Sequence, residues 1–265
     1  MTFASIVLTL AAVLSVKPTP RTEPNYAWWH ERLAEKSALV KAGGAPVVFL
    51  GDSITHFFEK GVSNGRSGEA LWKEVWSPPP YRALDLGFSG DRTEHLLWRI
   101  TEGGELDGYE AKAIVLMIGT NNFGQRADEP PMDVITGIKR ILETIRAKQP
   151  KARTVLCAIF PRGAGQSDPL RTKIDVVNRE IAKFADGKSV IWCDFTDELL
   201  EADGTLTRET MPDLLHPSLK GYRTWTDAVR PIVDDILLGD GLPIGPRCSE
   251  KHLMAAPETF SFHKK

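Results

Sequence analysis

Apolar residues follow two alternating patterns along the chain, short continuous runs and longer stripes at helical spacing. The runs are typical of buried strands in a parallel sheet, and they lie at 47–50, 81–86, 113–118, 154–160 and 190–195. The stripes predict amphipathic helices at 28–42, 93–100, 132–148, 169–184 and 219–238. Strands that alternate with helices pair in parallel through right-handed crossovers. The pattern therefore predicts the α/β class, as a three-layer α/β/α sandwich with a parallel sheet of about five strands.

The length of 265 residues predicts a single domain, which can bury about three quarters of its unfolded surface. We expect this domain at 26–240, between a signal segment and joint at 1–25 and a proline-bearing tail at 241–265 that is peripheral or loosely ordered. The apolar stretch at 3–16 has the length of a signal-peptide core and is short for a membrane span. No Lys or Arg precedes it, so a short buried helix and a misassigned start remain alternatives. The stretch favours a secreted or periplasmic location over a cytoplasmic one.

Composition and charge narrow the range of partners. Hydrophobic residues make up 42% of the chain and charged residues 26%, and the formal net charge is −2, as in an ordinary globular protein. This balance gives no electrostatic footprint for nucleic acid or an anionic membrane. Cys157 and Cys193 lie in strand-like runs and are expected to be buried thiols, whereas Cys248 lies in the tail. The three cysteines form neither a disulfide framework nor a zinc spacing, so we expect no metal and no organic cofactor.

The tripeptide Gly51-Asp52-Ser53 stands where the first apolar run ends. Ser53 is therefore expected just beyond the carboxyl end of a parallel strand, where open α/β sheets bind their ligands. The residues at 54–59 read as the first turns of a helix, whose unpaired N–H groups and positive dipole end favour a developing oxyanion. These features predict a nucleophilic serine and a hydrolase.

A serine hydroxyl is a weak nucleophile at neutral pH, so it needs a base and a group that orients the base. The segment Asp213-Leu214-Leu215-His216 offers both, because this spacing lets the carboxylate reach the imidazole Nδ1–H and leaves Nε2 for the serine. The alternative is that Asp213 only caps the helix that begins near Pro217 and that His216 is an ordinary surface residue.

Two loops are candidates to hold the negative charge of a tetrahedral intermediate. One loop, 87–91, follows the second predicted strand and the other, 119–122, follows the third, so both lie at the same edge of the sheet as Ser53. Glycine approaches a ligand closely and tolerates positive φ, which suits Gly90 as an N–H donor. Asn121 can direct a side-chain amide at the same point. The alternative for both is a turn residue that ends a strand.

Other features have weaker claims on the site. Ser63 lies in a Gly-x-Ser-x-Gly sequence that matches a nucleophile elbow, but residues 57–60 before it are not strand-like. His56 has no acidic partner at a matching spacing, so we expect it to line the pocket or face solvent. Five tryptophans are expected to pack in the core, and any that reaches the active edge would offer an apolar or sugar-stacking wall. They are Trp28, Trp29, Trp72, Trp76 and Trp98.

Gly-Asp-Ser, Gly-x-x-Gly-Asp, Gly-Thr-Asn-Asn and Asp-x-x-His, in this order, resemble the SGNH (or GDSL) hydrolase superfamily. Within it, the chain is most similar to the branch that holds the catalytic subunits of intracellular platelet-activating-factor acetylhydrolase and their bacterial esterase relatives. The similarity extends over 47–238. Its finer part rests on the blocks 90–99, 119–122, 160–163, 168–171 and 213–216.

The resemblance implies a flavodoxin-like SGNH hydrolase fold and an acyl-enzyme mechanism without metal or cofactor. Carried onto the matching positions, it assigns the nucleophile and one oxyanion N–H to Ser53, the second N–H to Gly90, the side-chain donor to Asn121, the base to His216 and its orienter to Asp213. One departure is Ser89, where relatives often have glycine beside the donor glycine. This difference concerns the backbone geometry of that loop.

The substrate is narrowed only to a class. The resemblance implies a small acyl group. A chain with a predicted signal segment and no lipid-binding composition favours O-acetyl esters of carbohydrate as the substrate. The alternatives are a platelet-activating-factor-like or lysophospholipid ester, and a thioester. A non-catalytic scaffold on the same fold is the alternative of another class, although no member of the triad or donor set is missing. The resemblance to dimer-forming subunits is compatible with a homodimer.

Overall fold

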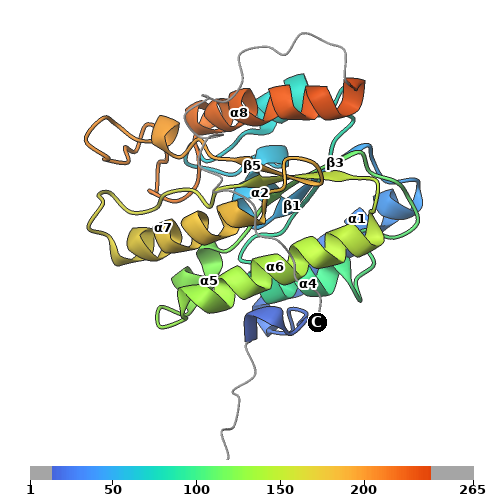
Figure 1. The fold of residues 1–265 in the computed structure, drawn as a ribbon, viewed down its shortest axis with the longest axis horizontal. Helices are drawn as coiled ribbons and strands as arrows, with labels where there is room; N and C mark the ends of the chain where they lie inside the picture. The colour runs from blue at the N-terminus through green and yellow to red at the C-terminus, as the bar shows by residue number, and fades with distance from the viewer. Residues whose placement is uncertain (1–13, 240–265) are drawn as a thin grey trace, which may run out of the picture.

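A five-stranded sheet forms the centre of the computed structural model, which describes residues 14–239 (Figure 1). The strands lie in the order β2-β1-β3-β4-β5, and each neighbouring pair is parallel. They are β1 (Val47–Gly51), β2 (Leu84–Gly87), β3 (Ala113–Met117), β4 (Arg153–Cys157) and β5 (Val190–Cys193). The predicted α/β class and parallel sheet are confirmed.

Each helix that an apolar stripe predicted is present, with ends that shift by a few residues. These helices are α1 (Ala27–Lys41), α4 (Thr93–Ile100), α6 (Pro131–Lys148), α7 (Pro169–Ile181) and α8 (Leu219–Leu238). Shorter helical segments lie in the connections, of which α3 and α5 are too short to show an amphipathic period in the sequence. They are α2 (Ser53–Glu59), α3 (Glu69–Leu71), α5 (Thr120–Gln125), η1 (Leu14–Val16), η2 (Pro24–Tyr26), η3 (Trp72–Trp76), η4 (Ala182–Phe184) and η5 (Asp197–Leu199).

All of the predicted strands except 47–50 are shorter in the structure, and the contacts of two of them, 81–86 and 154–160, show the reason. The first begins late because Arg82 has a φ of 40°, in the left-handed region, which a strand backbone does not adopt. The second ends early because a side chain replaces the ladder beyond β4. The N–H of Ile159 donates to Asn178 Oδ1 and Asn178 Nδ2 donates to the Ile159 carbonyl, both at 2.9 Å. Local hydrogen bonding by an amide therefore ends the strand.

Alternate strand residues face opposite helical layers. Val48 and Leu50 of β1 pack in a core with α1, α4, α6 and α7, whereas Val47 and Phe49 pack with α2, α3, η3 and α8. Figure 1 shows α8 on one side of the sheet and α4, α6 and α7 on the other. Because both faces are covered, the strands are mostly apolar, with Asp85 of β2 and Arg153 and Thr154 of β4 as exceptions, which accounts for the apolar runs in the sequence.

The side chains expected in the core are mostly there. The buried members are Trp29, Trp72, Trp76, Cys157 and Cys193. Trp28 and Trp98 are half-buried instead. Residues 3–13 of the predicted signal-peptide core lie outside the described residues. The whole of the predicted tail at 241–265, including Cys248, also lies outside them.

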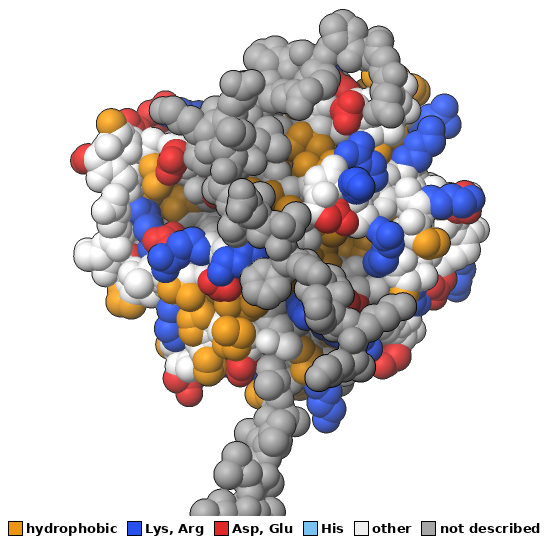
Figure 2. All heavy atoms as spheres, viewed as in Figure 1, with side chains coloured by type: hydrophobic (Ala, Val, Ile, Leu, Met, Phe, Trp, Pro, Cys, Tyr) orange, Lys and Arg blue, Asp and Glu red, His pale blue; other side chains and the backbone are white. Residues whose placement is uncertain are grey.

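The surface carries charges of both signs. Figure 2 shows Lys and Arg side chains interspersed with Asp and Glu on the face viewed, in keeping with the net charge of −2. Between residues 14 and 239, no helix combines the length and apolarity needed to cross a membrane.

The residues just before α1 pack onto the domain. Ser15 and Arg21 are buried, and the N–H of Thr19 donates to the carbonyl of Glu94 in α4 at 3.1 Å. The turn η1 lies against α4 and α6. The part of the predicted joint at 14–21 therefore packs against the α/β domain.

The carboxyl ends of the first three strands meet at one edge of the sheet. Gly51 lies opposite Gly87 of β2 and opposite Met117 of β3. Glycine at 87 permits the close approach of α2, because a Cβ there would lie 2.3 Å from the backbone nitrogen of His56. The loops that follow these strands are thereby brought close to the beginning of α2.

Phe49 should contribute strongly to stability, because it is buried where four aromatic rings meet it. Their centroids lie 4.9 to 6.0 Å from its own and belong to Phe58, Trp72, Trp76 and Trp225. We expect Phe49→Ala to lower the free energy of unfolding in urea by about 3 to 5 kcal/mol, through lost burial and a residual cavity. Met132→Ala, at a side chain that is 61% exposed, is the control and should change it by less than about 0.5 kcal/mol. Equal losses in the two variants would contradict this role of Phe49.

Candidate active site

Strand β1 delivers Ser53 to the carboxyl edge of the sheet. The strand ends at Gly51, and α2 begins at once because Asp52 caps it, with Oδ1 accepting from the N–H of Ile54 at 2.9 Å. Burial raises the pKa of the Asp52 carboxyl to about 7, although the Ile54 N–H acts in the opposite direction. As the first residue of α2, Ser53 has a backbone N–H without an acceptor inside the helix.

His216 bridges Ser53 and Asp213. Its Nε2 lies 2.8 Å from Ser53 Oγ, and its Nδ1 lies 2.7 Å from Asp213 Oδ2. Because an ionised carboxylate only accepts hydrogen bonds, Nδ1–H donates to Asp213, and Nε2 accepts from the Ser53 hydroxyl. The structure therefore joins the predicted nucleophile, base and orienter in one hydrogen-bonded chain, although Ser53 and His216 are 163 positions apart.

Asp213 organises its own loop and does not cap α8, whose N-cap is Ser218. Its Oδ1 accepts from the N–H groups of Leu215 and His216, at 3.1 and 2.7 Å. Its Oδ2 also accepts from Arg66 Nη1 at 3.1 Å. Burial acts to raise the pKa of Asp213, but the bonds and charge of His216 and the bond from Arg66 outweigh it and lower the pKa to about 2. Asp213 is therefore ionised at neutral pH.

The environment of His216 keeps the imidazole neutral at pH 7. Burial lowers its pKa below the ordinary value, the hydrogen bond and charge of Asp213 raise it, and the charges of Arg66 and Arg162 lower it again. The ring of Phe57 lies against the imidazole, with centroids 5.0 Å apart. A neutral imidazole whose Nε2 faces a hydroxyl is able to take its proton.

Gly90 stands at the third position of a tight turn over 88–91. The N–H of Asp91 donates to the Phe88 carbonyl at 3.1 Å, and the φ of Gly90 is 79°, as a type II turn requires at this position. Ser89 takes the second position, where its φ is not positive and an L-residue fits. The serine in place of glycine is therefore compatible with the turn. Among the residues that the structure describes, no acceptor is found for the Gly90 N–H.

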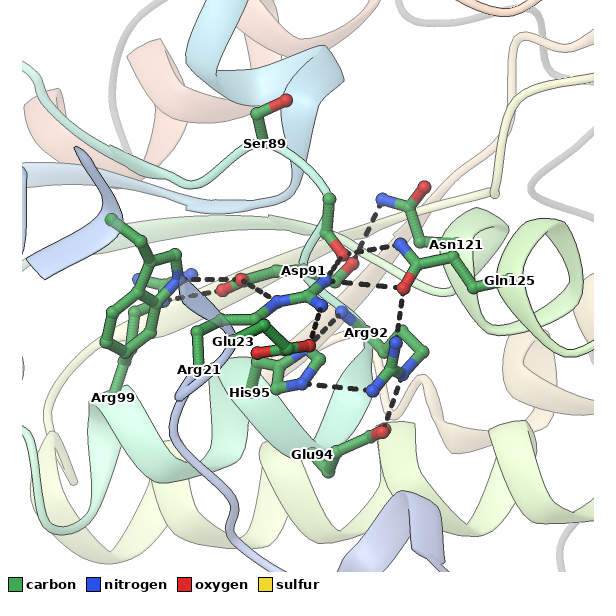
Figure 3. Close-up of polar contacts among 12 residues, drawn as sticks. Arg21, Glu23, Ser89, Asp91, Arg92, Glu94, His95, Arg99, Asn121 and Gln125 are labelled. Atoms are coloured by element: carbon green, nitrogen blue, oxygen red, sulfur yellow. Dashed lines mark hydrogen bonds and ion pairs between the residues drawn. The ribbon is translucent and has the colours of Figure 1, made fainter. Parts of the chain in front are cut away.

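Asn121 is tied to the same loop. Its Nδ2 donates to the Asp91 carbonyl at 3.0 Å, and Figure 3 shows the amide directed toward the loop. A side-chain amide carries two N–H groups, so a second one remains for a ligand. The two predicted oxyanion donors, Gly90 and Asn121, are therefore coupled through one short stretch of backbone.

A buried ion pair lies beneath this loop. The Asp91 carboxylate accepts from Trp29 Nε1 and from Arg99 Nε, each at 2.8 Å. Arg99 also donates to the carbonyls of Gly51 and Leu86, at 3.1 and 3.0 Å. The sequence carried a signal for this residue, because Arg99 interrupts the apolar face of a predicted helix.

The weaker candidates take different places. His56 is buried, its ring stacks on Trp28 with centroids 5.8 Å apart, and its Nδ1 accepts from the Ser89 N–H at 3.4 Å. Burial, assisted by the charge of Arg32, lowers its pKa to about 3, so it is neutral. The half-buried Trp28 thus lies next to the loop at 87–91 that holds the predicted donor Gly90. Ser63 is exposed in a loop with no strand before it, which removes the nucleophile-elbow alternative.

Three residues that the sequence did not single out also contact the site: Arg66, Arg21 and Gln125. Arg66 reaches Asp213 across 147 positions, and Arg21 reaches the Gly90 carbonyl across 69. No local spacing links these partners, so periodicity gave no signal for them. In the described part of the chain, no group of three or more His, Cys, Asp or Glu side chains is placed to share a metal ion.

A nucleophilic serine after the first strand of a parallel sheet, with His and Asp supplied by one late loop, defines the SGNH class of hydrolases. The chain belongs to the GDSL-like lipase/acylhydrolase family, which matches residues 49–224. Over 236 residues it is 33% identical to human platelet-activating factor acetylhydrolase IB subunit alpha1, covering 86% of this chain and 94% of that one. The recognised superfamily and branch are thereby confirmed.

Solved structures share the fold at low identity. A GDSL-like lipase from Bacteroides thetaiotaomicron superposes with a TM-score of 0.62 at 18% identity, over 79% of this chain and 98% of that one. A catalytic mutant of an acetylxylan esterase from Geobacillus stearothermophilus gives 0.52 at 17% identity, over 71% and 93%. These likenesses concern the fold, and the family match makes the chain a hydrolase.

The arrangement predicts how His216 titrates. Removing the nearby charge in Arg66→Gln should raise the pKa of His216, because a cation disfavours imidazolium. Asp213→Asn should lower it, because the favourable charge is lost. Both are measured by NMR titration of ring-labelled histidine, with His216→Gln to assign the signal. Lys151→Gln, at the amino edge of the sheet, is the control and should leave the titration unchanged. A fall in the pKa on removing Arg66 would contradict this electrostatic reading.

Proposed function

We propose that the protein is a serine esterase that hydrolyses short-chain esters, most of all acetyl esters, through an acyl-enzyme. The observation that carries this proposal is the continuous chain from Ser53 Oγ through the His216 ring to Asp213, with bonds of 2.8 and 2.7 Å. A non-catalytic scaffold would not require a neutral imidazole, that of His216, within hydrogen-bond distance of the Ser53 hydroxyl. This geometry therefore favours catalysis over the non-catalytic alternative.

In the first half-reaction, Ser53 Oγ attacks the ester carbonyl carbon while His216 Nε2 takes the hydroxyl proton. The carbonyl oxygen becomes an oxyanion, which the backbone N–H groups of Ser53 and Gly90 and the free amide N–H of Asn121 stabilise. The bond to the alcohol oxygen then breaks, and His216 returns the proton to the leaving alcohol. Asp213 remains ionised and stabilises the imidazolium in between.

In the second half-reaction, a water molecule attacks the acyl-enzyme. His216 takes a proton from this water, the same donors hold the second oxyanion, and the bond from the acyl carbon to Ser53 Oγ breaks. The carboxylic acid leaves, and Ser53 recovers its proton from His216. No step calls for a metal ion or an organic cofactor.

We favour O-acetyl groups on carbohydrate as the substrate class. The acetylhydrolase relative and the acetylxylan esterase neighbour are both named for acetyl chemistry, which supports a small acyl group. Trp28 is half-buried beside the oxyanion loop, and a partly exposed indole face is suited to stacking on a sugar ring. A platelet-activating-factor-like ester is the second candidate, favoured by the 33% identity to that acetylhydrolase subunit.

Ser53→Ala should lower kcat by about four decades or more on p-nitrophenyl acetate, because the nucleophile is lost. Ser63→Ala is the matched control, at an exposed serine outside the site, and should behave as wild type. The assay includes butyrate and octanoate esters, a 2-acetyl phospholipid, and acetic acid release from acetylated xylan oligomers. Turnover confined to acetyl esters with release from xylan supports the carbohydrate class, and preference for the phospholipid or octanoate supports lipid. Near-normal activity of Ser53→Ala would remove the assignment of the nucleophile.

Asn121→Ala should lower kcat by about two to three decades with little change in KM, because its amide acts on charge that develops only in the transition state. Steady-state kinetics on p-nitrophenyl acetate measure the effect, and urea denaturation checks that the fold is retained. A rise in KM at unchanged kcat would assign Asn121 to substrate binding instead.

A further inference from the structure

Two side chains from separate segments hold the carbonyl of Gly90. Arg21 Nη2 donates to this oxygen from the segment before α1, and Gln125 Nε2 donates to it from the end of α5 at 2.8 Å. Figure 3 shows the two side chains converging on the loop, next to the Asn121 amide. A carbonyl oxygen with two lone pairs is thereby saturated by donors that its own turn does not supply.

In the part of the chain that the structure describes, the peptide between Ser89 and Gly90, which carries the proposed oxyanion N–H, is held through the peptide groups on either side of it. Before it, the N–H of Ser89 donates to His56 Nδ1 at 3.4 Å. After it, the Gly90 carbonyl is bound by Arg21 and Gln125. The Gly90 N–H itself has no acceptor among the described residues. Its position is therefore set by the groups that hold the neighbouring peptides.

The side chain of Arg21 is buried and held by neighbouring residues in the position that makes this contact. It is 1% exposed, Glu23 accepts from its Nη1 at 2.9 Å, and its guanidinium lies 4.2 Å from the centroid of the Tyr26 ring. Burying a guanidinium costs desolvation free energy unless its N–H groups are paired. The buried position of Arg21 therefore depends on these contacts. A Cβ on Gly90 would lie 3.3 Å from both Arg21 Nη2 and the Tyr26 hydroxyl. The N-terminal segment therefore packs directly against the loop.

The long ion pair between Arg21 and Asp91 does not by itself account for the position of this arginine. The Asp91 carboxylate is already bound by Trp29 and Arg99, each at 2.8 Å. Arg21 Nε stays 3.9 Å from Asp91 Oδ1 and has no hydrogen-bond partner of its own. The carbonyl of Gly90 is thus the contact that ties Arg21 to the loop.

We infer that Arg21 and Gln125 are positioning residues of the oxyanion hole, which act by holding the Gly90 carbonyl so that the Gly90 N–H meets the developing negative charge. This inference rests on the proposed function, in which that N–H is an oxyanion donor. A donor displaced by a fraction of an ångström loses much of its effect on the transition state and little on substrate binding.

The test compares matched substitutions at Gln125, whose side chain is exposed. Gln125→Glu keeps the oxygen that accepts from Arg21 and Arg92 but loses the N–H donor. Gln125→Lys keeps a donor. We expect the Glu variant to lower kcat on p-nitrophenyl acetate about tenfold with KM within about twofold, and the Lys variant to retain most of the activity. Equal losses in the two variants would overturn the role of the donor.

Arg21 is tested in parallel with Arg21→Met and Arg21→Lys, alone and combined with Gln125→Glu. We expect the Met variant to lose about tenfold in kcat and the double variant about a hundredfold, with partial recovery in the Lys variant. Arg140→Met, at an exposed arginine of α6, is the control and should match wild type. Unfolding in urea is measured for each variant, and a loss of activity that followed lost stability or raised KM would overturn the positioning role.

A fluorophosphonate probe separates this inference from the proposed function, because it reacts with an activated serine and also develops charge on an oxygen. Wild type should label at Ser53, and the double variant should label about a hundredfold more slowly. Labelling and turnover at wild-type rates in the double variant would overturn the positioning role and leave the esterase intact. A wild-type protein that neither labels nor turns over any ester would overturn both.

Discussion

The guanidinium of Arg99 joins the ends of β1 and β2, two of the three strands whose carboxyl ends carry the candidate site. It is fully buried, donates to the carbonyls of Gly51 in β1 and Leu86 in β2, and pairs with the carboxylates of Asp91 and Glu105. Charges removed from water cost several kcal/mol each unless their partners are well placed, so loss of any one partner leaves the others uncompensated. This cluster thereby fixes the carboxyl edge of the sheet, and the loops that carry the site depend on that edge.

The two carboxylates nearest Ser53, those of Asp52 and Asp213, differ in burial and in the direction of their pKa shifts. Asp213 lies at the rim, where donors from its own loop and from Arg66 lower its pKa to about 2. Asp52 is fully buried, and burial raises its pKa to about 7. The carboxylate that supports His216 is therefore charged whenever the base is neutral, while the one beneath the serine serves the helix cap.

The segment before α1 and the first turn of that helix contact a candidate site whose predicted residues lie within the family match at 49–224. Arg21 contacts the Gly90 carbonyl, and Trp28 stacks on His56 beside the same loop. Ser53, Gly90, Asn121, Asp213 and His216 lie inside the matched range, whereas Arg21 and Trp28 lie before it.

By itself, the sequence determined the alternation of strands and longer helices, to within a few residues at their ends, and the order in which Ser53, Gly90, Asn121 and the Asp213–His216 pair follow the strands. Periodicity is a local property, and the carboxyl ends of parallel strands must meet at one edge, so these features could be derived without coordinates. The tertiary structure alone decided that Arg66 supports Asp213 and that Arg21 and Gln125 hold Gly90. These contacts join loops that are far apart in the chain, and their partners are set by how the loops pack, which no local pattern of residues encodes.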